Sequence, residues 1–111
     1  MSQQLDVIID QGANFVQTWQ IDNKQLATGY TFAAKFRPQH ASTTTVLSIT
    51  SFTAVHSGQH TLLSCNVAAA TTANLPAPSQ GVYDIEYTQT SNGAVTRAVE
   101  GTYYVTPEAT K

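Results

Sequence analysis

The chain has 111 residues, of which only 11% are charged, and its five Lys and Arg against seven Asp and Glu give a formal net charge of −2. A typical soluble domain is about 25% charged, whereas here Thr alone, with 17 residues, outnumbers all charged side chains together. The length predicts a single domain over residues 1–111. Clustered basic residues and long apolar runs are both lacking, which argues against a nucleic-acid partner and against a membrane span.

The N-terminus and the cysteine content predict where the chain folds. Residues Met1–Asp6 lack the basic segment and the following apolar segment of a secretory signal peptide. Cys65 is the single cysteine of the sequence, so the chain cannot form an intrachain disulfide. Both features fit a protein that is made and folded in a reducing cytosol.

Apolar and polar residues alternate along most of the first half, which is the pattern of half-buried strands. In the clearest case, residues 30–37, aromatic side chains and Ala34 occupy one face while Lys35 and Arg37 occupy the other. Pro38 ends this strand because proline has no N–H group for a sheet ladder. The predicted strands are Leu5–Ile9, Asn14–Ile21, Tyr30–Arg37 and Val46–Phe52, with turns at 10–12 and 22–24.

The second half predicts three further strands and one helix. Residues 68–75 are rich in Ala and end before Pro76, so we expect a short helix that bridges two sheets, with Leu75 at the edge of the core. His56–Gln59 is a predicted turn. The expected strands are Thr61–Val67, Val82–Thr88 and Ala94–Val105.

The last two strands form a hairpin whose register depends on the length of its loop. A two-residue turn would place Glu100 opposite Ile85, which puts a carboxylate on the apolar face. A three-residue loop with its glycine in the left-handed conformation instead pairs Ile85 with Val99, and we expect this register. Arg97 then lies opposite Tyr87, where a cation–π contact is expected.

These elements predict an all-β fold: a single Ig-like antiparallel β-sandwich of about seven strands, with one short helix near residues 68–75. Alternation also places several of the few charged side chains on outward strand faces, namely Lys35, Arg37, Asp84 and Glu86. The remaining exterior is left to Thr, Ser and Gln.

The sequence predicts no catalytic, cofactor-binding or metal-binding residue, and therefore a protein that is not an enzyme. It has no Gly-x-Ser-x-Gly motif, and its glycines are scattered singly rather than gathered in a phosphate loop. Cys65 lies within a strand, where a cysteine acts as a small apolar residue. His56 and His60 are separated by a turn and lack a third ligand, and His40 lies in a polar loop. Asp22–Asn23 lacks the other ligands of a calcium loop.

Carboxylate pairs raise the hypothesis of a small hydrolase. The chain has two such pairs, Asp6 with Asp10 and Asp84 with Glu86. The second pair shares one strand face at a spacing of about 7 Å, which resembles the spacing of glycosidase carboxylates. Outward carboxylates on a hairpin are more often solvated, so we expect this pair to face Lys35 or Arg37 across a strand.

Exposed aromatic rings raise a further hypothesis, a glycan-binding or adhesin module, because such rings can stack on sugars. Alternation directs most rings of this chain inward. Tyr104 and Tyr30 are the two that we expect on the surface.

Three stretches of sequence together carry a resemblance to a known family. They are Asp-Gln-Gly-Ala-Asn-Phe at 10–15, Leu-Ala-Thr-Gly-Tyr-Thr at 26–31, and a closing run at 75–102 that contains Gly-Val-Tyr-Asp-Ile-Glu and Val-Thr-Arg-Ala-Val-Glu-Gly-Thr. In this order they resemble the small β-sandwich structural proteins of tailed bacteriophages, similar to the N-terminal domain of baseplate upper proteins. The resemblance covers nearly the whole chain and supplies no catalytic residues.

The resemblance implies a virion component, made in the host cytoplasm, that packs against other virion proteins as a homo-oligomer or symmetric array. A tail, baseplate or fibre-associated position ranks ahead of capsid decoration. Contacts made by Thr and Gln are neutral, so they depend less on salt than ion pairs do. We expect the terminal segments 2–4 and 106–111 to serve as arms that lie on a neighbour.

Overall fold

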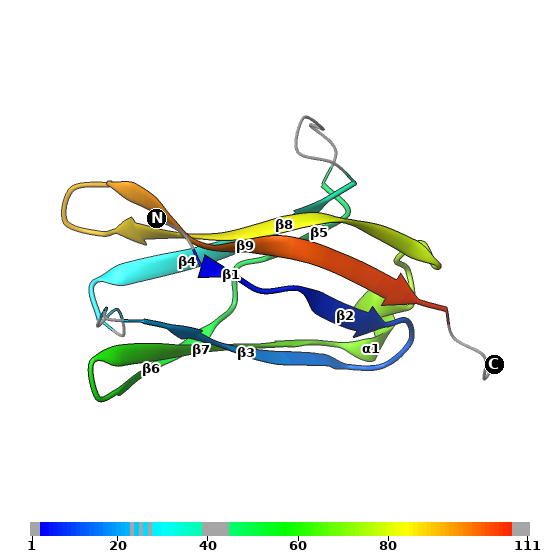
Figure 1. Ribbon diagram of the computed structural model, residues 1–111, viewed down its shortest axis with the longest axis horizontal. Helices are drawn as coiled ribbons and strands as arrows, with labels where there is room; N and C mark the ends of the chain where they lie inside the picture. Colours follow the sequence, from blue (N-terminus) through cyan, green and yellow to red (C-terminus); the bar gives the residue numbers. More distant parts are fainter. Residues whose placement is uncertain (1–2, 23, 25, 27, 39–44, 108–111) are drawn as a thin grey trace.

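In the computed structural model, a six-stranded sheet packs face to face on a three-stranded sheet (Figure 1). The structure describes residues 3–22, 24, 26, 28–38 and 45–107. Within these residues the strands are β1 (Gln3–Gln4), β2 (Val7–Asp10), β3 (Phe15–Ile21), β4 (Tyr30–Arg37), β5 (Leu47–Ile49), β6 (Thr53–Ser57), β7 (His60–Val67), β8 (Ser79–Gln89) and β9 (Val95–Thr106). The helix α1 (Ala69–Thr72) lies between β7 and β8.

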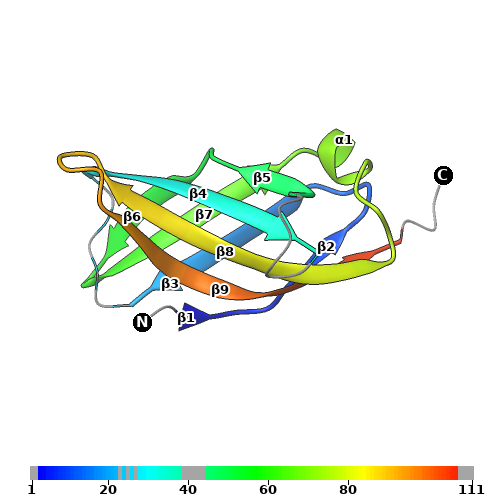
Figure 2. The ribbon, with the colours of Figure 1, turned by 90° about the horizontal axis from the view of Figure 1, so that it is seen from above.

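The strand order is β1-β9-β8-β4-β5 in the larger sheet, where β2 also pairs with β9, and β3-β7-β6 in the smaller one (Figure 2). Two packed sheets that hold nearly all of the secondary structure, with one short helix between β7 and β8, form a β-sandwich of the Ig-like class. The predicted all-β Ig-like fold with one short helix is therefore confirmed.

The N-terminal strands differ from the expected antiparallel arrangement. Both β1 and β2 run parallel to β9, with Val7 opposite Tyr103 and Ile9 opposite Val105 (Figure 1). An alternating pattern specifies which face a residue occupies but not the direction of the neighbouring strand, so the sequence could not reveal this. Residues 3 and 4, which we expected to reach a neighbouring molecule, pair with β9 of the same chain.

The core lies between the sheets and is built from the inward-facing members of each alternating strand. Phe36 of β4 is at its centre, where its ring stacks on Tyr83 at 5.0 Å and meets the edges of Phe15 and Tyr103. The face assignments predicted for residues 14–21 and 30–37 are confirmed. On β7, of the two leucines considered, Leu63 is the buried one.

The predicted strand Val46–Phe52 is wrong at its C-terminal end. Strand β5 covers Leu47–Ile49, after which the chain crosses to the other sheet and begins β6 at Thr53. Strand β6 was not predicted, because Thr53–Ser57 exposes most of its side chains and carries little apolar alternation. The turn after β6 is centred on Gly58, which has a positive φ of 62°.

Helix α1 is shorter than the predicted segment 68–75, although Leu75 is buried as expected. Its position is fixed by Thr72, whose hydroxyl donates to the Ala13 carbonyl at 2.7 Å and accepts the Gly12 N–H at 3.1 Å. The Asn14 carboxamide accepts the Ala69 N–H at 2.8 Å. The helix is thus held by polar side chains against the turn between β2 and β3.

The hairpin of β8 and β9 has the predicted pairing of Ile85 with Val99 but a different register beyond it. A bulge at this point leaves Ala98 as the extra residue, so Tyr87 pairs with Thr96 and Glu86 pairs with Arg97. The expected cation–π contact between Arg97 and Tyr87 is therefore wrong. Compared with the predicted register, this one-residue bulge moves every β9 residue between the bulge and the turn to the opposite face of the sheet.

The segment joining β1 and β2 lies very close to β9. A Cβ on Gly101 would be 2.0 Å from the carbonyl oxygen of Leu5, so only glycine permits this approach. Asp6 accepts the Thr102 N–H at 3.0 Å through its carboxylate. The Asp10 carboxylate accepts the Thr106 hydroxyl at 2.7 Å in the same way. These two carboxylates hold the N-terminal segment in place.

A buried hydroxyl joins both sheets to the N-terminal segment. Tyr83 of β8 accepts the indole N–H of Trp19 at 3.1 Å and donates to the carbonyl of Leu5. Burial is the main reason that the pKa of Tyr83 rises to about 12, while the hydrogen bond from Trp19 opposes this shift and the charge of Asp6 adds to it. The neutral phenol is thus a structural group.

We expect the free energy of unfolding to fall by roughly 2–3 kcal/mol between pH 10 and pH 12 on account of Tyr83. Since the folded-state pKa lies above the unfolded value, this contribution is fully present below pH 10 and is lost as the pH rises through about 12. Urea denaturation at several pH values measures it. In Tyr83→Phe the decline should be clearly shallower, and an equal decline would contradict this assignment.

Candidate interaction surfaces

The outward face of the six-stranded sheet carries half of the charged residues of the chain. The structure places Lys35, Arg37, Asp84 and Glu86 on this face as predicted, and it adds two residues of β9. The six are Lys35, Arg37, Asp84, Glu86, Arg97 and Glu100. With three cations and three anions, this face is charged but balanced.

Asp84 belongs to a cluster of ion pairs on this face. Its carboxylate lies 3.7 Å from Nε of Arg97, and Nη1 of the same guanidinium lies 3.5 Å from Glu100. Lys35 is opposite Asp84 in the sheet register, as expected. Half-exposed ion pairs of this kind contribute under about 1 kcal/mol each, so this cluster contributes little to folding.

The strands of the three-stranded sheet carry, in contrast, no charged side chain on their outward face apart from His60, and the Asp22 carboxylate lies beside His60 at one end of it. Two valines are prominent on it, since Val16 and Val55 have exposed fractions of 63% and 49%. The sheet register places ten described side chains on this neutral face, which is defined here as Val16, Thr18, Gln20, Thr53, Val55, Ser57, His60, Leu62, Ser64 and Asn66.

The two described histidines, His56 and His60, do not lie together. The register of β6 and β7 pairs His56 with Thr61 and His60 with Ser57, so the two imidazoles point to opposite faces of the sheet. Nδ1 of His60 lies 3.5 Å from Asp22. Across the described residues, no group of three His, Cys, Asp or Glu side chains could hold a metal ion. His40 and Asn23, also considered from the sequence, lie outside the described residues.

Cys65 is buried between the sheets, as the sequence predicted. Burial raises the pKa of its thiol, and a hydrogen bond with the backbone of Gln17 opposes the shift. The thiolate is the reactive form of cysteine. This environment therefore favours a packing role over nucleophilic chemistry.

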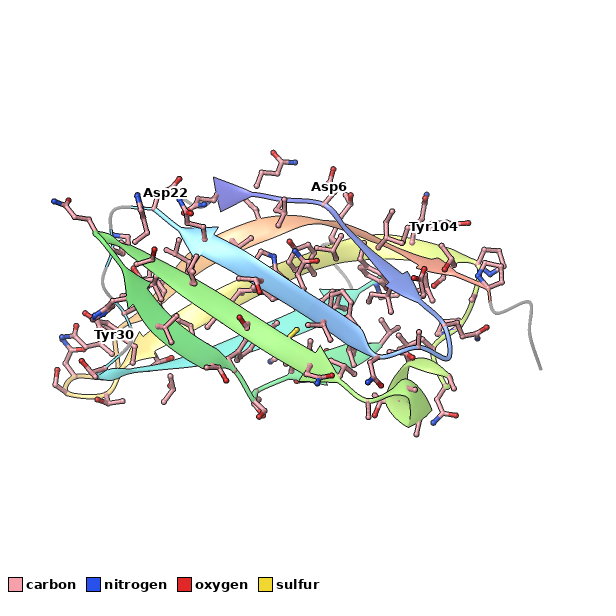
Figure 3. All side chains as sticks on the ribbon, turned by 90° about the horizontal axis from the view of Figure 1, so that it is seen from below. Asp6, Asp22, Tyr30 and Tyr104 are labelled. Carbon is pink, nitrogen blue, oxygen red and sulfur yellow. The ribbon has the colours of Figure 1, made fainter. Side chains whose placement is uncertain are left out.

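Tyr104 lies on the outer surface as predicted, with an exposed fraction of 40% (Figure 3). It borders a shallow groove of about 540 Å³ that is also lined by Ile8, Gln80 and Thr102. Tyr30, the other expected surface ring, is half-buried and packs edge-on against Tyr87 at 5.5 Å. The two tyrosines lie toward opposite ends of the molecule (Figure 3), so they do not form one aromatic platform.

A second hollow, of about 400 Å³, lies where β1 approaches the outer edge of β3. It is lined mainly by glutamines and by Leu5, Thr18 and Trp19. The side chain of Gln3 reaches across it to the backbone of β3. No sequence pattern pointed to this hollow, because residues 3 and 20 meet only in the folded sandwich.

Comparisons with known proteins do not identify a family for this chain. No helix of the described chain is long and apolar enough to cross a membrane. No family model matches the sequence, and no curated protein matches it either. The chain is similar to a solved structure of the NK cell receptor Nkp44, described as a triggering partner in natural cytotoxicity. The match covers 97% of this chain and 99% of the receptor chain, with 11% sequence identity and a TM-score of 0.44.

Proposed function

We propose that this protein is a non-enzymatic structural component of a tailed-bacteriophage virion and that it acts through protein–protein contacts. The observation that carries the proposal is the neutral face of the three-stranded sheet. Depletion of charge is what distinguishes the buried centre of protein interfaces from the remaining surface. The exposed Val16 and Val55 supply apolar contact area at this face.

The two sheet faces have different roles in this proposal. The neutral face packs against a neighbour, because Thr, Ser, Gln and Asn side chains can exchange water for protein partners without leaving a charge unpaired. The charged face of the other sheet remains toward solvent, where its six charged side chains keep their hydration instead of paying the cost of desolvation.

The sequence resemblance supports a position in the virion, with a tail, baseplate or fibre-associated site ahead of capsid decoration. In this proposal the chain is made in the host cytoplasm, resides in the virion, and assembles with other virion proteins as a homo-oligomer or symmetric array. Mass spectrometry of purified particles tests it. We expect the chain at a fixed copy number per particle, and its absence from particles would overturn the proposal.

The particle-bound chain should also stay bound at high salt. Raising NaCl from about 0.1 to 1 M shortens the Debye length from roughly 10 to 3 Å, and a contact between neutral faces is little affected. Sedimentation of particles at the two concentrations, followed by quantification of the chain in pellet and supernatant, measures this. Release at 1 M would indicate that the charged face forms the contact instead.

A glycan-binding module is the second candidate, and the groove beside Tyr104 is the observation that favours it. In that case the isolated protein binds members of a glycan array, and Tyr104→Ala abolishes the binding while the fold is retained. Incorporation into particles by the Tyr104→Ala variant would favour the structural role.

A further inference from the structure

Strand β3 is an outer strand of the three-stranded sheet, and its free edge is engaged by a side-chain amide. Nε2 of Gln3 donates to the carbonyl of Gln20 at 2.8 Å, and Oε1 of Gln3 accepts the N–H of Asp22 at 2.7 Å. The N–H and the C=O of one residue in a neighbouring parallel strand would bond residues two apart in the same way. The Gln3 carboxamide therefore stands in for the backbone of a missing strand.

A second amide bonds the same edge. Nε2 of Gln17 donates to the carbonyl of Thr18 at 3.2 Å. Backbone groups of alternate residues point to the same side of a strand, so Val16, Thr18 and Gln20 direct theirs away from β7. Among the described residues, Gln3 and Gln17 are the side chains that bond these outward carbonyls.

The hollow of about 400 Å³ beside this edge offers space for a further strand. One wall is β3 itself, and the other is formed by residues 3–5 with Val99 of β9. Leu5 is 40% exposed at this wall. Seen with all side chains, β1 runs alongside β3 on this side of the sandwich (Figure 3). A strand placed there would contact both sheets.

We propose that the β3 edge receives an extended, uncharged segment of a neighbouring virion protein as a fourth strand of the smaller sheet. The inference rests on the proposed function and names a partner at the edge of the sheet that carries the neutral face. Pairing by backbone hydrogen bonds at an exposed sheet edge is a common mode of peptide recognition. The side-chain amides of Gln3 and Gln17 already form hydrogen bonds with backbone groups of this edge. The backbone amides of the entering segment replace them.

The occupant is uncharged because the hollow is lined by neutral side chains apart from Asp22. That carboxylate is already bonded by Nε2 of Gln20 at 2.8 Å and lies 3.5 Å from His60. The occupant is named as a segment of another virion protein because the proposed function sets the chain among such proteins, and a second copy of this chain is an outcome that the cross-linking below distinguishes.

Two substitutions at one position test the backbone pairing. Thr18→Pro removes an N–H that points to the free edge, which a strand at a sheet edge tolerates, whereas Thr18→Ala removes the same side chain and keeps the N–H. Circular dichroism of both isolated variants establishes that they fold. We expect Thr18→Ala to enter particles at the normal copy number. The copy number of Thr18→Pro should fall by at least about tenfold, because losing about 1.4 kcal/mol of contact at the edge weakens binding tenfold.

Hydrogen exchange of the unmodified chain gives a second measurement that does not depend on a variant. In assembled particles, the amides of Val16, Thr18 and Gln20 should exchange at least about tenfold more slowly than in the isolated protein. Cross-linking mass spectrometry then identifies the segment that lies beside residues 15–21, and we expect it in another virion protein.

Three outcomes would overturn the inference in distinguishable ways. The strand addition is wrong, and the structural role stands, if the chain is in particles but these amides exchange at the same rate as in the isolated protein. The same conclusion follows if Thr18→Pro reaches the same copy number in particles as Thr18→Ala. A cross-linked segment from a second copy of this chain would overturn the stated partner. Absence of the unmodified chain from particles would overturn the proposed function and this inference together.

Discussion

Replacing Phe36 with alanine is expected to lower the free energy of unfolding by about 3–5 kcal/mol. The side chain is fully buried on β4, an interior strand of the larger sheet, and its ring contacts those of Phe15, Tyr83 and Tyr103. Removal leaves a cavity between the two sheets that rigid neighbouring strands cannot close. Because a domain of this size is stable by about 5–15 kcal/mol, the variant should unfold at a much lower temperature or denaturant concentration.

Urea denaturation followed by tryptophan fluorescence measures this effect, since Trp19 is the one tryptophan of the sequence and is buried in the same core. Tyr104→Ala is the matched control, because it removes an aromatic ring from the outer side of the same sheet. The control should change stability by under about 1 kcal/mol. Equal losses in the two variants would contradict the assignment of Phe36 to the centre of the core.

Replacing Gly101 with alanine is expected to detach the N-terminal segment from β9 and to cost about 3–5 kcal/mol. The new Cβ would lie 2.0 Å from the carbonyl oxygen and 2.7 Å from the carbonyl carbon of Leu5, which are backbone atoms that cannot rotate away. Val7 and Ile9 belong to this segment and are buried in the core, so its detachment would expose them. Exposing an apolar side chain of this size costs about 1.5–3 kcal/mol.

Gly93→Ala is the control for this prediction, because at Gly93 glycine is favoured by a positive φ and not by a close contact. Gly93 has a positive φ of 74° and open space around its Cα, so alanine there costs only about 1–2 kcal/mol of backbone strain. Hydrogen exchange separates the two variants. In Gly101→Ala, the amides of residues 5–10 should lose protection while those of β4 and β8 keep it, and retained protection at 5–10 would contradict the proposed clash.

The sequence alone predicted those parts of the fold that depend on local alternation. The apolar faces of residues 14–21 and 30–37 are dense enough in aromatic side chains that only one orientation buries them. The pairing of Ile85 with Val99 followed from excluding a buried carboxylate. The outward positions of Lys35 and Asp84 followed from the same two-residue period, and the structure confirms them.

The features that the sequence did not predict are set by contacts between distant residues. Thr61 and Thr72 are fully buried although threonine is usually exposed, because each hydroxyl bonds backbone groups of another segment. The parallel course of β2 depends on the close approach at Gly101. The bulge at Ala98 changes the register without leaving a signal in the alternation.

The candidate interaction surfaces were also predicted only in part from the sequence. The low charge of the sequence predicted a largely neutral exterior. Only the strand register shows that six charges gather on one sheet, while the strands of the other carry none on their outward face apart from His60, with Asp22 beside it. The role of Gln3 at the β3 edge could not be predicted, because its partners Gln20 and Asp22 are brought near it by the fold.

Electron microscopy of intact particles, at a resolution that separates the two sheets of this sandwich, tests the central claim most directly. The account predicts that the neutral face around Val16 and Leu62 lies against another virion protein, with the face of Lys35 and Glu86 toward solvent. Particles in which the charged face is buried and the neutral face is open, or in which the chain is absent, would contradict it.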